Sequence, residues 1–281
     1  MKTVDKILAR MKLCNTLVCC GLDPDLKKIP FEISELKISD EEKVYKFICS
    51  VVDLTSSHVC VYKAQKAYFD LLPSGHEVLK NVIGYVHKTC PQVPVILDCK
   101  IGDIDNTMSV YIKNIFGNLE ADGVVANPFM GNDTIIPLAE LSEKAIVVLV
   151  QTSNPTAAVI QDLILQNGNP LWKYILDLLV NDWNYNNNMI PVFSSNSTWD
   201  LSETRKFIPN DMPILLAGIG AQGGNYSNLR HLLNTEGIGV FVNSSREILY
   251  PAQNQKSWDA ATEEAVVKLK NELNKARGQN E

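Results

Sequence analysis

The sequence has no apolar run near the roughly 20 residues needed to span a bilayer, so we expect no membrane-spanning helix. Its first segment, MKTVDKILARMK, carries charges within its only apolar stretch and lacks the core of a secretory signal. Basic residues are also in deficit, since 26 Lys and Arg face 32 Asp and Glu, a net charge of −6. That sign disfavours nucleic acid as a partner, because backbone phosphates are bound by an excess of cations.

Histidine and paired cysteine are scarce as well. The four histidines show no ligand spacing, which argues against a metal centre or a histidine-based triad. The seven cysteines include no C-x-x-C pair, and several lie inside apolar runs, as is typical of reduced, packed thiols. We therefore expect a cytoplasmic protein without a metal. An anionic ligand would need a local group of cations or backbone N–H donors.

Short apolar runs rich in β-branched residues alternate with segments of helical spacing, such as 44–52 and 171–179. The runs show no polar alternation, which favours parallel strands buried on both faces. Eight such units predict a (β/α)8 (TIM) barrel, one α/β domain over residues 1–281, with a doubly wound open sheet as the alternative. The predicted strands are 18–22, 59–62, 95–97, 123–126, 145–150, 189–193, 214–217 and 237–242.

Polar or charged residues follow nearly every predicted strand. In a barrel these strand ends meet at one mouth, whereas in an open sheet only those near a switch point meet. This pattern favours the barrel. Elsewhere we expect a surface loop at 181–188 and the least order at 275–281.

The third strand leads into Asp98, Lys100 and Asp103. Side chains alternate along a strand, so Asp98 and Lys100 are predicted to point together into the mouth. Taken alone, the pair could be an ion pair on a solvated strand end, contributing about 0 to 1 kcal/mol. Lys63 after the second strand adds another cation, so two lysines and two carboxylates are predicted to share one cleft.

The segment 218–223 satisfies G-x-G-x-x-G, the dinucleotide fingerprint. However, it comes late in the chain, and Asn243 stands where an acidic residue is expected. In a barrel, the loops after strands seven and eight commonly bind phosphate. We therefore predict a phosphate site in which Gly220 and Gly223 expose backbone N–H groups and Arg246 supplies a bidentate cation.

The D-x-K-x-x-D run, with Ile104, Thr107 and Lys63, resembles the charged tetrad of the orotidine 5′-monophosphate decarboxylase family. The resemblance covers nearly the whole chain and is closest to a bacterial subgroup. It includes the blocks DKILARM, CCGLDPD, VYKAQKAYFD, VVANPFMGND, QTSNPTA, GIGAQGG and VNSSREILY. It implies decarboxylation of orotidine 5′-monophosphate to uridine 5′-monophosphate in de novo pyrimidine biosynthesis, without a cofactor.

The resemblance also implies a role for each matching residue. Lys100 would stabilise a carbanion at C6 of the pyrimidine and protonate it, with Asp98 and Asp103 fixing the ammonium. A symmetric homodimer is implied, in which Asp103, Ile104 and Thr107 reach the neighbouring subunit's pocket. The implied substrate contacts are Asp23 and Lys63 to the ribose, Ser153 to the pyrimidine edge, Gln222 to phosphate and pyrimidine, Arg246 to the phosphate, and Gln65 and Thr152 close by.

Three places depart from the family pattern: Ala217 replaces a usual Pro, 194–196 reads Ser-Ser-Asn, and Glu247 replaces a small residue. They put the shape of the phosphate loop and the contacts of the sixth strand in doubt, but they leave the four charged residues unchanged. Residues 153–155 could also form a simple turn. Two other functions stay open, a metal-dependent sugar-phosphate decarboxylase on the same scaffold and a non-catalytic sensor of a phosphorylated ligand. The blocks QTSNP and GAQGG, which bind the pyrimidine in the family that the chain resembles, argue against the sugar-phosphate decarboxylase. The charged tetrad argues against the sensor, which would need only the phosphate loop.

Overall fold

The apolar runs form eight parallel strands, each paired with the next along the chain, and β8 pairs with β1 to close the barrel. The computed structural model describes residues 1–219, 226–252 and 256–278. The predicted barrel is confirmed, and the open-sheet alternative is wrong. The strands are β1 (Val18–Leu22), β2 (Val61–Gln65), β3 (Val95–Ile101), β4 (Gly123–Ala126), β5 (Ala145–Leu149), β6 (Met189–Ser194), β7 (Ile214–Ala217) and β8 (Val240–Ser244).

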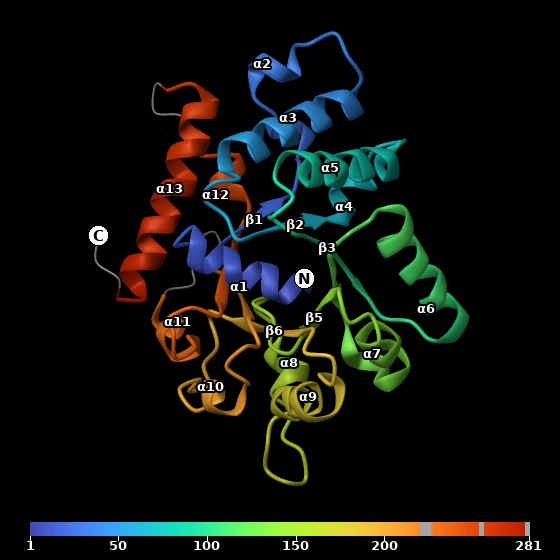
Figure 1. Ribbon diagram of the computed structural model, residues 1–281, viewed down its shortest axis with the longest axis vertical. Helices are drawn as coiled ribbons and strands as arrows, with labels where there is room; N and C mark the ends of the chain where they lie inside the picture. Colours follow the sequence, from blue (N-terminus) through green and yellow to red (C-terminus); the bar gives the residue numbers. More distant parts are fainter. Residues whose placement is uncertain (220–225, 253–255, 279–281) are drawn as a thin grey trace.

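Helices connect the strands and surround the barrel (Figure 1). The described helices are α1 (Thr3–Leu13), α2 (Phe31–Ser34), α3 (Asp40–Thr55), α4 (Lys66–Phe69), α5 (Gly75–Thr89), α6 (Asp105–Ile112), α7 (Asn132–Ala139), α8 (Ala158–Gln161), α9 (Leu171–Leu178), α10 (Thr204–Phe207), α11 (Ser227–Leu232), α12 (Arg246–Leu249) and α13 (Trp258–Ala276). Shorter 3-10 and π segments are η1 (Leu26–Lys28), η2 (Lys113–Asn118), η3 (Pro128–Met130) and η4 (Leu179–Trp183).

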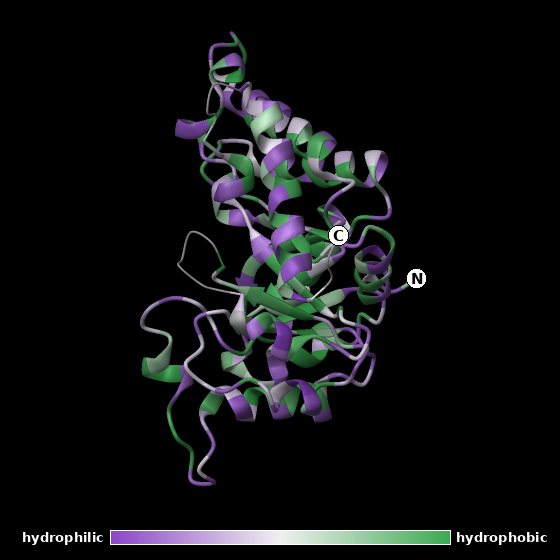
Figure 2. Ribbon diagram, turned by 90° about the vertical axis from the view of Figure 1, so that its left-hand side faces the viewer, coloured by the Kyte–Doolittle hydropathy of each residue, from purple (hydrophilic) through white to green (hydrophobic). Residues whose placement is uncertain are grey.

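The core lies in and around the strands, where hydrophobic residues gather, while hydrophilic residues mark the outer faces of the helices (Figure 2). Burial of both strand faces explains why the runs show no polar alternation. Large side chains such as Tyr62, Phe193 and Phe241 are fully buried. Among the described residues, no helix is both long and apolar enough to cross a membrane.

Two strands begin and end later than predicted. The second begins at Val61 and includes Lys63, and the eighth begins at Val240 and includes Asn243. In the eighth run, Gly237 and Gly239 have φ values of 71° and 84°, a left-handed conformation outside the extended region that regular strand pairing uses. Both strands therefore carry polar residues to the barrel mouth within the strand rather than after it.

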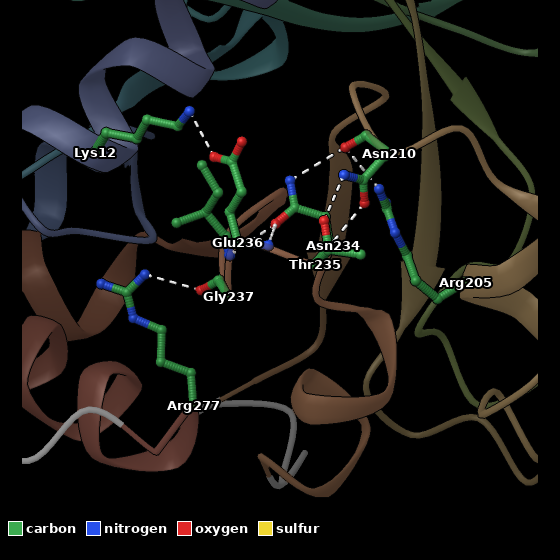
Figure 3. Close-up of polar contacts among 9 residues, drawn as sticks. Lys12, Arg205, Asn210, Asn234, Thr235, Glu236, Gly237 and Arg277 are labelled. Atoms are coloured by element: carbon green, nitrogen blue, oxygen red, sulfur yellow. Dashed lines mark hydrogen bonds and ion pairs between the residues drawn. The ribbon is translucent and has the colours of Figure 1, made fainter.

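At the other end of the barrel, a polar cluster joins the loops before β7 and β8 to both ends of the chain (Figure 3). Lys12 in α1 pairs with Glu236, and Arg277 after α13 donates to the carbonyl of Gly237 at 3.0 Å. Within the segment 275–281, where we expect the least order, α13 continues to Ala276 and Arg277 is bonded to the loop before β8. Residues 279–281 lie outside the described part.

The polar stretch 181–188 is not simply a surface loop. Its first residues continue the helical segment η4 to Trp183, and Asn188 is fully buried. The Asn188 amide donates to the carbonyls of Ala139 and Leu141, both at 3.1 Å. Buried backbone carbonyls need such donors, so this asparagine serves packing rather than turn formation.

Candidate active site

A cavity of about 830 Å³ opens at the carboxyl ends of the strands. Such a volume fits a small ligand. Eight of the predicted site residues line it: Asp23, Lys63, Gln65, Asp98, Lys100, Thr152, Ser153 and Arg246. Gly220, Gln222 and Gly223 lie outside the described residues.

One carboxylate joins two ammonium groups in this cavity. Asp98 Oδ2 accepts a hydrogen bond from Lys63 Nζ at 2.8 Å, and Asp98 Oδ1 accepts one from Lys100 Nζ at 2.7 Å. Lys63 and Asp98 are each 6% exposed, whereas the Lys100 side chain is 48% exposed. The buried Asp98 carboxylate therefore fixes the Lys100 ammonium, while part of the Lys100 side chain stays open to the cavity.

The electrostatics of this group depend on the neighbouring charges. Burial alone would raise the pKa of Asp98, but Lys63 and Lys100 outweigh burial and lower that pKa below its ordinary value. Burial would likewise lower the pKa of Lys63, yet Asp98 and Asp23 raise it. The Asp98–Lys63 pair is therefore ionised at neutral pH. Asp98 stabilises the fold above the ordinary carboxyl pKa, and this contribution is lost as pH falls through its lowered value.

The backbone at Lys100 departs from a regular strand. The pairing of β3 with β4 shifts register between Leu97 and Ile101, and Lys100 has a φ of 45°. Positive φ is uncommon outside glycine, and such strain persists where the surrounding structure enforces it. The expected contact between Asp98 and Lys100 exists, but regular alternation is the wrong reason for it. A local bulge directs the lysine instead.

Asp103 does not join this group within one chain. It is not among the described residues that line the cavity, and its Oδ1 accepts from the backbone N–H of Ile104 at 2.9 Å. The loop after β3 leads from Asp103, which is half-buried, into α6, where Ile104 is 43% exposed and Thr107 is also exposed. Within one chain, the described residues therefore bring Lys63, Asp98 and Lys100 together without Asp103, and the prediction of two carboxylates in one cleft needs the neighbouring subunit that the resemblance implies.

Another part of the cavity wall carries Arg246, at the start of α12 and two residues after the end of β8. Gly21 in β1 makes room for Ser245, the residue before Arg246, because a Cβ at position 21 would lie 1.9 Å from Ser245 Oγ. Ala217 and Glu247, both departures from the family pattern, also line the cavity. Glu247 accepts from Ser244 Oγ at 3.3 Å, so its carboxylate has a local partner.

Sequence reasoning missed Gln161, which holds the loop after β5. Its side chain accepts from the N–H of Thr152 at 2.9 Å and donates to Thr152 Oγ1 at 2.8 Å. The loop that contains Ser153 is therefore closed by a side chain nine residues away and is more than a simple turn. A polar residue within the apolar stretch 158–164 was the available signal.

Among the described residues, no group of three or more His, Cys, Asp or Glu side chains is arranged to hold a metal ion. Asp23 Oδ1 is a buried acceptor in the cavity that has no hydrogen-bond partner among the residues that the structure describes. An unpaired buried carboxylate oxygen is costly, so it is a ready acceptor for a hydroxyl donor on a ligand.

The strain at Lys100 can be measured by comparing two substitutions. Lys100→Gly and Lys100→Ala both remove the ammonium, but only glycine adopts a positive φ without steric cost. We expect Lys100→Gly to be more stable than Lys100→Ala by about 1 kcal/mol, measured by urea unfolding. At Lys80, an exposed position within α5, we expect the reverse order, because glycine weakens a helix. If the alanine variant were more stable than the glycine variant at position 100 as well as at position 80, the backbone at Lys100 would not be strained.

Comparison with known proteins agrees with this geometry. The profile of the "Orotidine 5'-phosphate decarboxylase / HUMPS family" matches residues 16–261. A protein named orotidine 5′-phosphate decarboxylase from Dechloromonas aromatica is 33% identical to this chain, over 98% of this chain and 99% of its own length. A protein of the same name from Cellvibrio japonicus is 34% identical, over 99% of this chain and 100% of its own length. The structure of Leishmania donovani OMP decarboxylase superposes with a TM-score of 0.80 at 26% identity, covering 99% of each chain. The chain belongs to the orotidine 5′-phosphate decarboxylase / HUMPS family.

Proposed function

We propose that this protein is a carbon-carbon lyase that decarboxylates orotidine 5′-monophosphate to uridine 5′-monophosphate in pyrimidine biosynthesis. Its family and its full-length relatives support this activity. The observation that carries the proposal is the Lys100 ammonium, held by Asp98 at 2.7 Å and half exposed at the cavity. A cation fixed in this way can offset negative charge that develops on a bound ligand.

The reaction breaks the bond between C6 of the pyrimidine and its carboxylate. Carbon dioxide leaves, and the electron pair stays on C6 as a carbanion. Lys100 stabilises that charge and then transfers a proton from Nζ to C6, after which solvent reprotonates the amine. Asp98 keeps the ammonium in place, because its carboxylate is buried and already bonded to Lys63. No cofactor is needed in this sequence of steps.

The substrate's other groups fit the remaining walls. Arg246 would bind the phosphate, together with Gly220, Gln222 and Gly223. The unpartnered Asp23 Oδ1 would accept from a ribose hydroxyl, near Lys63. Ser153 would meet the pyrimidine edge, with Gln65 and Thr152 close by. Binding of the remote phosphate then helps to position C6 against Lys100.

Catalysis by Lys100 is tested by an absorbance assay for loss of orotidine 5′-monophosphate, run in EDTA. We expect full activity in EDTA and a loss of about 100-fold or more for Lys100→Ala, because the proton donor is removed. Lys206→Ala, which removes an exposed ion pair with Glu203 on α10, is the matched control and should keep full activity. Loss of wild-type activity in EDTA would favour a metal-dependent sugar-phosphate decarboxylase, and an active Lys100→Ala would refute the mechanism.

The active unit is a symmetric homodimer in this proposal, with Asp103, Ile104 and Thr107 completing the partner's site. This part is supported by two observations: none of the three is among the described residues that line the cavity of a single chain, and Ile104 and Thr107 are exposed. Apolar side chains lie exposed nearby, with Val110 65% and Phe129 84% exposed. Exposed apolar surface of this kind is common at protein interfaces.

Shared sites predict complementation between two inactive variants. Mixing Lys100→Ala with Asp103→Ala after subunit exchange should restore about one quarter of wild-type activity, because half of the dimers would contain one intact site. Each variant alone should stay inactive. No recovery after mass spectrometry has verified exchange would count against sharing across the interface.

We propose further that residues 1–281 form a single domain and act in the cytoplasm. The continuous barrel core supports the first point. All seven cysteines are free and five of them are buried, which suits a reducing compartment.

A further inference from the structure

The hydroxyl of Tyr250 lies between two backbone groups of the segment that follows β1. Its oxygen accepts a hydrogen bond from the N–H of Asp25 at 2.6 Å and donates one to the carbonyl of Asp23 at 3.3 Å. The backbone N–H of Tyr250 donates to the carbonyl of Arg246 at 2.9 Å, which closes α12. One residue therefore joins the segment carrying Asp23 to the segment carrying Arg246.

The Tyr250 ring is itself held in place. It stacks on Phe47 of α3 with ring centroids 5.7 Å apart and an interplanar angle of 21°. Lys28 Nζ lies 5.8 Å from the ring centroid and also pairs with Asp25. Burial raises the pKa of Tyr250, so the hydroxyl stays protonated at neutral pH and remains a donor.

The two segments that Tyr250 joins form adjacent walls of the cavity. They continue from β1 and β8, which pair directly through Cys19 with Asn243 and Cys20 with Ser244. Asp23 and Arg246 line the cavity, whereas Tyr250 is not among the described residues that do so. Tyr250 therefore acts through these residues and not by touching a ligand.

We infer that Tyr250 is a positioning residue that sets the distance between the ribose acceptor Asp23 and the phosphate-binding Arg246. The inference rests on the proposed function, which assigns those two contacts. A fixed spacing matters because the phosphate is remote from C6, and its binding assists the reaction only when the intervening ribose is held in register. A shift of the Asp23 segment relative to Arg246 would displace the pyrimidine from Lys100.

Tyr250→Phe deletes only the bridging hydroxyl and keeps the stacked ring. We expect kcat/KM for orotidine 5′-monophosphate to fall about 10-fold, as follows from the loss of two neutral hydrogen bonds. Tyr85→Phe is the matched control, because it removes a hydroxyl that donates to Asp53 at 2.7 Å, away from the cavity, and should leave kcat/KM unchanged. Thermal unfolding of both variants verifies that they fold.

A double-mutant cycle with Asp23→Ala separates positioning from general stability. If Tyr250 acts through Asp23, Tyr250→Phe should cost less than about 3-fold in the Asp23→Ala background, since coupled residues are not additive. A Tyr250→Phe variant with wild-type kcat/KM, or losses that multiply in the double variant, would overturn the inference while leaving the proposed function intact. A wild-type protein that fails to decarboxylate the substrate would instead refute the proposed function itself.

Discussion

The site depends on one buried carboxylate that bonds to two lysines. Asp98 is 6% exposed and has Lys63 on one oxygen and Lys100 on the other. Removing a buried partner leaves a charge uncompensated, at a cost of roughly 3–5 kcal/mol. Without Asp98, the buried Lys63 ammonium would keep the influence of Asp23 but lose its ion pair. Lys100 would lose its only ion pair among the described residues.

The barrel makes this arrangement possible because it brings neighbouring strands to one mouth. Lys63 lies in β2 and Asp98 in β3, and these strands pair with Lys63 opposite Ile96 and Gln65 opposite Asp98. The register therefore places Asp98 two residues beyond Lys63, within reach of the longer lysine side chain. A bulge and a positive φ then direct Lys100 back onto Asp98. Local strain and a rigid scaffold together fix the position of the ammonium.

Much of this could be predicted from the sequence, because the strands carry continuous apolar runs and end in polar residues. Asp98, Lys100 and Lys63 follow from that pattern together with the family resemblance. The bulge at Lys100 could not be predicted, since it arises from pairing with β4. The family resemblance implied that Asp103 serves a neighbouring subunit, but the spacing of the charged residues alone could not place it, because a sequence does not give the direction of a loop.

Contacts between distant segments were also beyond prediction. Tyr250 bonds to residues more than 200 positions away, and Gly21 faces Ser245 across the β1–β8 closure. Each depends on the barrel closing, which no local pattern describes. Residues that do not line the cavity, such as Tyr250, thus hold its walls in place, while the charged side chains lie on the residues that line it.

Asp98 stays ionised because two lysines hold it. A ¹³C NMR titration of aspartate-labelled protein, with the Asp98 signal assigned by Asp98→Asn, measures this directly. We expect a pKa for Asp98 below the ordinary aspartate value of about 3.9, and a higher value after Lys63→Ala. A pKa at or above the ordinary value in the wild-type protein, or one that Lys63→Ala leaves unchanged, would contradict it.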